Sequence, residues 1–226
     1  MFTTILRQQF KFLVFQKVEI DLDRHLASYL TYIFIVSWIV GMGRYWDHPD
    51  AYFWQYAGLG SVIYIVVLSA FLYAVVLPLK PKRWSYSLVL IFVGLTSLPA
   101  LLYAIPVERF MPLDQAQIVN AWFLGIVALW RVLLYVQFLF KGAGLGKFGT
   151  LIATLLPLSG IVVVLAILNL EHVMFDMMSG VRPGNESPND IAYQVVFLLS
   201  MFAFMAFPIT LICYMVEISR RKGDMT

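Results

Sequence analysis

Six long runs of apolar residues follow one another along the chain, each bounded by charged or turn-forming residues. Each run is about 20 residues long, and a helix of that length crosses the roughly 30 Å hydrocarbon core of a bilayer. The connections between the runs are short. The pattern therefore predicts six transmembrane helices: Ala27–Gly43, Gly58–Leu79, Tyr86–Ile105, Asn120–Phe140, Phe148–Leu170 and Ile191–Val216.

The first stretch of the chain has a different pattern. Its apolar residues recur close to helical spacing, whereas Arg7, Gln8 and Lys11 gather on another side. This arrangement is typical of an amphipathic helix that lies on a membrane surface. Docking on a partner protein is the alternative. The apolar residues are Phe2, Ile5, Leu6, Phe10 and Leu13.

These patterns define the expected fold class and domain organisation. We expect an all-α polytopic membrane protein with six transmembrane helices and an N-terminal interfacial amphipathic helix. Residues 1–26 form the cytoplasmic amphipathic helix, residues 27–216 the six-helix bundle, and residues 217–226 a cytoplasmic tail. No segment is long and polar enough to fold as a separate soluble domain.

The basic residues are distributed unequally between the two ends of the predicted bundle. Twelve of the sixteen Lys and Arg residues lie on one side, and only Arg44, Arg109 and Arg182 lie in the other connections. Because short cytoplasmic loops carry an excess of Lys and Arg, we predict that both termini are cytoplasmic. The predicted location is the cell membrane, which is the inner membrane in a bacterium. The twelve are Arg7, Lys11, Lys17, Arg24, Lys80, Lys82, Arg83, Lys141, Lys147, Arg220, Arg221 and Lys222.

The composition supports the assignment as a membrane protein and limits the kinds of partner that we expect. Hydrophobic residues make up 61% of the chain and charged residues 13%, about half the charged fraction of a soluble domain. The single cysteine excludes an intrachain disulfide and a cysteine-based metal site. We expect the lipid bilayer and other membrane proteins, or a second copy of the chain, as partners, and no nucleic acid.

The glycine-rich segment "KGAGLGKFGT" (Lys141–Thr150) resembles a phosphate-binding loop only superficially. That motif needs a Gly separated by four residues from the Gly-Lys pair, and Ser or Thr after the Lys. Lys141 and Phe148 occupy these two positions. The segment is a turn between two spans, and no cofactor is predicted.

Arg131 lies near the middle of the fourth predicted span. A charged side chain at this depth is costly and usually faces protein or water. It therefore has three interpretations: contact with a substrate or ion, bonding to helix carbonyls, and snorkelling toward the headgroups. Prolines inside three spans, Pro99, Pro157 and Pro208, free backbone carbonyls that need internal partners.

Charged and histidine residues are concentrated in the three connections predicted to be external. Imidazole and carboxylate groups suit divalent ions, and a histidine beside carboxylates can respond to protons. We therefore treat their convergence at the bundle mouth as a hypothesis. The alternative is an aromatic belt with ordinary ion pairs across residues 44–56. The candidates are Arg44, Asp47, His48, Glu108, Arg109, Glu171, His172 and Asp176, in addition to Arg131, and none is assigned as catalytic or as a metal ligand.

The sequence favours a non-enzymatic scaffold or a subunit of a membrane complex, because no complete catalytic set or cofactor motif is present. A transporter or channel for a small solute, ion or lipid is the first alternative, on the basis of Arg131, the span prolines and the charged mouth. An outer-face membrane enzyme that uses His48, His172 and the neighbouring carboxylates is the second.

Overall fold

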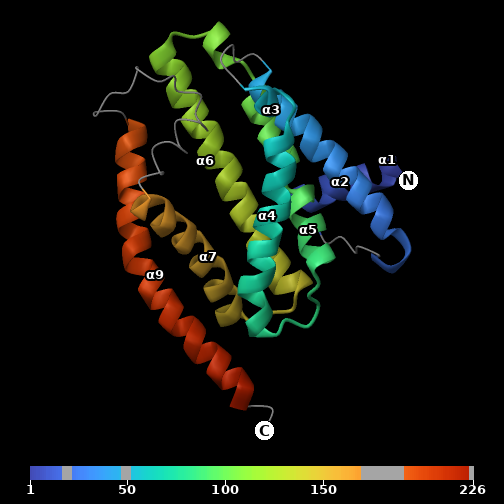
Figure 1. The fold of residues 1–226 in the computed structure, drawn as a ribbon, viewed down its shortest axis with the longest axis vertical. Helices are drawn as coiled ribbons and strands as arrows, with labels where there is room; N and C mark the ends of the chain where they lie inside the picture. The colour runs from blue at the N-terminus through green and yellow to red at the C-terminus, as the bar shows by residue number, and fades with distance from the viewer. Residues whose placement is uncertain (17–21, 47–51, 169–190, 224–226) are drawn as a thin grey trace. The chain divides into compact units, whose positions relative to one another are not determined.

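The computed structural model describes residues 1–16, 22–46, 52–168 and 191–223. All regular structure in these ranges is helical, and six of the helical segments are long and apolar enough to cross a membrane (Figure 1). The predicted fold class, an all-α polytopic membrane protein, is confirmed. The chain divides into two units: Met1–Pro106 with Trp130–Gly144 form unit 1, and Val107–Leu129 with Leu145–Thr226 form unit 2.

Unit 1 contains the first three spans and the end of the fourth. Within it, α2 packs against α4, α5 and η2, and α4 packs against α5. Its elements are α1 (Phe2–Leu13), α2 (Leu22–Tyr45), α3 (Phe53–Tyr56), α4 (Leu59–Val76), η1 (Leu77–Leu79), α5 (Tyr86–Leu95), η2 (Leu98–Ala104), the last part of α6 (Leu113–Gln137), and the π-helical turn η4 (Phe138–Gly142).

Glycines lie where the helices of unit 1 cross. A Cβ on Gly94 of α5 would be 2.5 Å from the Cβ of Ile33 on α2. A Cβ on Gly41 of α2 would be 2.7 Å from the carbonyl oxygen of Gly58, at the start of α4. Small residues allow helix backbones to approach closely in membranes, where tight packing is a main source of association. These glycines therefore set the distance from α2 to α4 and α5.

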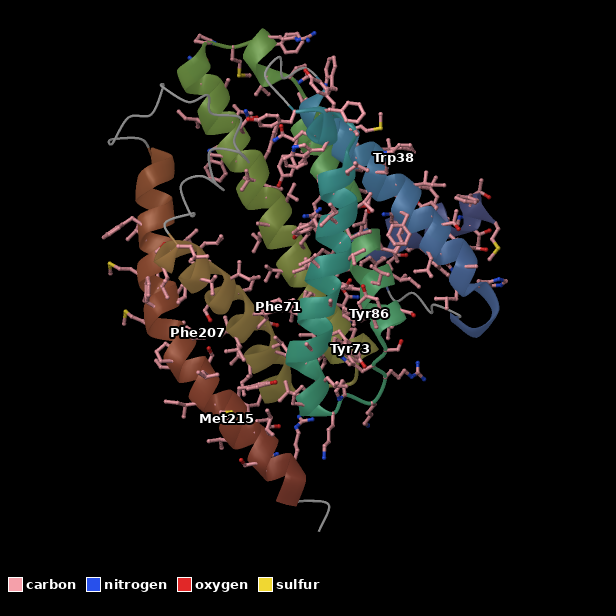
Figure 2. The ribbon with its side chains drawn as sticks, viewed as in Figure 1. Trp38, Phe71, Tyr73, Tyr86, Phe207 and Met215 are labelled. Carbon is pink, nitrogen blue, oxygen red and sulfur yellow. The ribbon has the colours of Figure 1, made fainter. Side chains whose placement is uncertain are left out.

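Aromatic rings fill the space between α4, α5 and η4. Phe92 of α5 stacks on Phe138 at 4.2 Å between ring centroids. Tyr73 of α4 contacts Tyr86 at 6.1 Å and stacks on Trp84 at 6.4 Å (Figure 2). These contacts join the helices on one side of the unit.

The N-terminal amphipathic helix predicted from the sequence is present as α1. Its buried side packs on helices of this same chain, with the Phe12 ring at 5.8 Å from Phe92 in an edge-on contact. Phe2, Leu6 and Phe10 remain exposed. The predicted apolar side is thus divided between the protein and its surroundings. The buried residues are Ile5, Gln9, Phe12 and Leu13.

The third span is not the continuous helix predicted over Tyr86–Ile105. The α-helix α5 ends at Leu95, and the chain continues after Thr96 and Ser97 as the 3-10 helix η2. Pro99, in the first turn of η2, cannot donate a backbone hydrogen bond, and its ring crowds the carbonyl four residues earlier, which favours an end to the α-helix here. We call the junction at Thr96–Ser97 the break.

Unit 2 contains η3 (Val107–Arg109), the first part of α6, α7 (Lys147–Ile167) and α9 (Ile191–Gly223). Helices α7 and α9 pack side by side (Figure 1). A Cβ on Gly160 of α7 would be 3.2 Å from the ring of Phe207 on α9 (Figure 2). Buried residues on α9 recur every seven positions, the repeat of a helix-pairing seam. They are Ala203, Thr210 and Glu217.

Candidate functional site at the break in the third span

The break leaves two backbone carbonyls without their α-helical donors. The carbonyl of Leu95 would be bonded by residue 99, which is a proline without an N–H group. The N–H of Ala100 bonds the carbonyl of Ser97 at 3.0 Å and does not reach back to Thr96. In hydrocarbon, an unsatisfied backbone group costs several kcal/mol. The carbonyls of Leu95 and Thr96 therefore need donors from elsewhere.

Side chains from two distant parts of the chain supply these donors. The Gln9 Nε2 group of α1 donates to the Leu95 carbonyl at 2.7 Å. The Arg131 Nε group of α6 donates to the Thr96 carbonyl at 3.0 Å. The break is thus a junction of three helices, α1, α5 and α6, joined by polar contacts.

Gln9 is held in one orientation by its neighbours. It is fully buried, and its Oε1 atom accepts a hydrogen bond from the Tyr32 hydroxyl of α2. Because Oε1 is engaged as an acceptor, Nε2 is directed to Leu95. The adjacent Gln8 accepts a hydrogen bond from Tyr29, one turn earlier on α2.

Helix α6 also fastens the end of α1. The last carbonyls of any α-helix lack partners within that helix. Trp130 Nε1 donates to the carbonyl of Leu13, and Gln137 Nε2 donates to the carbonyl of Phe15, both at 2.9 Å. Trp130, Arg131 and Gln137 thus form a row of donors on α6 that serves α1 and the break together.

The position of Arg131 distinguishes between its three interpretations. Its Nε atom is bonded to the third span, and its guanidinium carbon is 5.9 Å from the centre of the Tyr64 ring on α4. Contacts with these two helices hold the side chain against the protein, which disfavours snorkelling. The bond to Thr96 matches the interpretation as a carbonyl-bonding residue, and it leaves contact with a ligand open.

The predicted outer cluster falls largely outside the described residues. Asp47, His48, Glu171, His172 and Asp176 are not described. Arg44 is near the end of α2 and Glu108 is in η3, but only their backbones are described. Arg109 ends η3; the residue is exposed and has an interaction partner. The convergence of these residues stays a prediction.

Among the described residues, no three His, Cys, Asp or Glu side chains are grouped as a metal site.

Gln9 is the residue that the sequence prediction missed. It lies four residues after Ile5 and four before Leu13, so it is a polar residue in the middle of the apolar side of α1. That position is a usable signal, because a buried amide needs partners. The identity of its partner, 86 positions away, has no local signal.

Unit 2 has one buried charge of its own. Glu217 of α9 is 4% exposed, and its Oε1 atom accepts a hydrogen bond from Arg221 Nε at 2.7 Å. A Cβ on Gly149 of α7 would be 3.0 Å from the Arg221 Nη2 atom, so the guanidinium lies against the α7 backbone. The Glu217–Arg221 pair therefore joins this end of α9 to α7.

The six apolar helices define a multipass membrane protein. Comparison of the chain with protein-family models, with curated proteins and with solved structures finds no match.

Proposed function

We propose that this protein is a non-enzymatic scaffold or a subunit of a membrane complex, and that α9 carries the partner-binding surface. The observation that supports this is how little of α9 is packed. Only 11% of the residues in its membrane-spanning window are buried, against 44% in α7. Helix α9 is also the longest helix described, at 33 residues.

Six exposed apolar side chains of α9 form a regular row, which we call the α9 ridge. Successive members are four, three, four, three and four residues apart, which is the spacing by which helices interlock their side chains. Their exposed fractions run from 50% to 66%. Contact with lipid chains does not require this regular spacing of side chains, whereas packing against a partner helix does. The α9 ridge consists of Leu198, Phe202, Met205, Ile209, Ile212 and Val216.

The test is to replace the side chains at the centre of the α9 ridge by alanine. The wild-type protein, extracted in mild detergent, should be detected by native mass spectrometry with a stoichiometric membrane partner or as an oligomer. The triple substitution Phe202→Ala, Met205→Ala and Ile209→Ala should weaken this complex by about tenfold or more, because alanine removes the side chains that the partner would cover.

A matched control lies on the other helix of the same pair. Leu151, Leu155 and Leu158 are exposed on α7, and their triple substitution by alanine should leave the complex intact. A wild-type protein that is monomeric and without partners in the native membrane, as judged by cross-linking before extraction, would contradict the proposal. Equal loss of the complex in both triple variants would do so as well.

A second candidate function is transport of a small solute or ion, and the break in the third span supports it. Transporters form binding sites near the bilayer midplane where helices are discontinuous. The break lies midway along the spanning segment Tyr86–Ala104. Uptake of a solute into proteoliposomes that is lost in Arg131→Leu would favour this candidate over the scaffold.

We further propose that the protein resides in the cell membrane with both termini in the cytoplasm, on the basis of the basic residues. Single cysteines at Asp50, Asp114 and Glu186, in a Cys213→Ser background, should react with a membrane-impermeant thiol reagent in intact cells. Cysteines at Lys82 and Lys147 should react only after permeabilisation. The reverse pattern of labelling would overturn this orientation.

A further inference from the structure

Arg131 has more hydrogen-bond donors than unit 1 uses. A guanidinium group carries five N–H groups. The Nε group bonds the Thr96 carbonyl, and the four N–H groups on Nη1 and Nη2 have no hydrogen-bond partner within the described part of unit 1. No ion pair joins Arg131 to a described acidic side chain.

The depth of Arg131 makes these donors costly. The residue lies close to the middle of the spanning segment Ile118–Gly142. A charged group at this depth is found with a partner or in contact with water. The contacts with Thr96 and Tyr64 hold it there, so it does not reach the headgroups. One backbone carbonyl satisfies one donor, and no described acidic side chain serves as a counterion to the positive charge.

The geometry of the guanidinium specifies the chemistry of a ligand that it can bind. Its two terminal nitrogens present parallel N–H groups that match the two oxygens of a carboxylate or phosphate. Anchoring through Nε and the Tyr64 ring leaves this terminal edge as the part that a ligand can bond. An oxyanion would supply both the negative charge and the acceptors.

We propose that Arg131 binds an oxyanion, a carboxylate or phosphate group, beside the break in the third span. Tyr64, which covers the guanidinium, is 46% exposed, and its neighbours Ile63 and Val67 on α4 are exposed as well. This apolar approach favours an amphipathic molecule with an anionic head as the source of the oxyanion. The site goes beyond the scaffold proposal, which rests on α9.

The test compares three probes on the purified full-length protein in a neutral detergent. Oleate supplies a carboxylate on an apolar chain, methyl oleate supplies the same chain without charge, and inorganic phosphate supplies a free oxyanion. Oleate should raise the thermal unfolding midpoint of the wild type by about 5 °C or more at a hundred times its dissociation constant. Methyl oleate should not.

Two variants assign the effect to Arg131. Arg131→Gln should abolish the oleate-dependent shift. Arg83→Gln removes the same charge from an exposed position in the same unit and should retain the shift. If Arg131→Gln does not fold, Arg131→Lys takes its place: it keeps the charge but loses the paired N–H groups, and it should bind oleate at least tenfold more weakly.

The outcomes separate the sources of the oxyanion. A shift with phosphate as large as that with oleate supports the site and assigns it to a free anion. The proposal is overturned if no probe stabilises the wild type, if oleate and methyl oleate act equally, or if the Arg131 variant responds as the wild type does. None of these results bears on the α9 ridge, whose test is the composition of the complex.

Discussion

Replacing Gly94 by alanine should destabilise unit 1 severely, by about 3 kcal/mol, at the upper end of what overpacking costs. The added Cβ would lie 2.5 Å from the Cβ of Ile33, closer than two carbon atoms approach. Both residues are buried, so α2 and α5 would have to move apart. The expected result is a lower thermal unfolding midpoint in detergent and a smaller yield of monodisperse protein.

A double-mutant cycle identifies the contact responsible. In an Ile33→Gly background, which removes the opposing Cβ, adding Gly94→Ala should cost little. In an Ile33→Ala background the Cβ remains, and the full cost should remain with it.

Gly125→Ala is the matched control, because nothing lies within 4 Å of its added Cβ. Alanine forms helix better than glycine, so this variant should be as stable as the wild type or more so. Wild-type stability of Gly94→Ala would show that α2 and α5 do not cross here as described.

The positions of the spans could be predicted from the sequence because the bilayer sets their length and composition. The second run, expected over Gly58–Leu79, is found over Leu59–Leu79. The third, expected over Tyr86–Ile105, is found over Tyr86–Ala104. These agreements need no knowledge of packing, because a run of apolar residues that ends in charges marks the hydrocarbon boundary by itself.

The internal arrangement of the third span could be predicted only in part. Pro99 indicated that carbonyls would be freed and would need partners. Which side chains fulfil that need depends on where α1 docks and how α6 is rotated, and both are properties of the assembled unit. Gln9 is 86 residues from Leu95, and Arg131 is 35 residues from Thr96. Local sequence patterns carry no information about such pairs.

Because local patterns do not identify distant partners, the sequence left three interpretations of Arg131. Its depth followed from its place in the fourth span, but its direction followed from the position of the break. The outer residues His48 and His172 illustrate the opposite case. Their clustering was inferred from loop shortness alone, and since neither lies among the described residues, it stays a prediction.

Removing Arg221 should destabilise unit 2 strongly. Glu217 is 4% exposed, and Arg221 Nε is its partner at 2.7 Å, whereas Arg220 Nη1 is 4.0 Å away. Arg221→Leu leaves a buried carboxylate with only this distant partner. Breaking a buried pair in this way costs about 3–5 kcal/mol. Unfolding of the purified protein by titration with a denaturing detergent should show the loss.

Two further variants, one at both residues of the Glu217–Arg221 pair and one at the neighbouring Arg220, provide the controls. The double variant Glu217→Leu and Arg221→Leu should be more stable than Arg221→Leu alone, because it removes the stranded charge together with its partner. Arg220→Leu removes an equal charge from a side chain that is 72% exposed, and surface pairs contribute about 0–1 kcal/mol, so it should be close to wild type. If Arg221→Leu and Arg220→Leu are equally mild, Glu217 reaches solvent, and the Glu217–Arg221 pair does not hold α9 against α7.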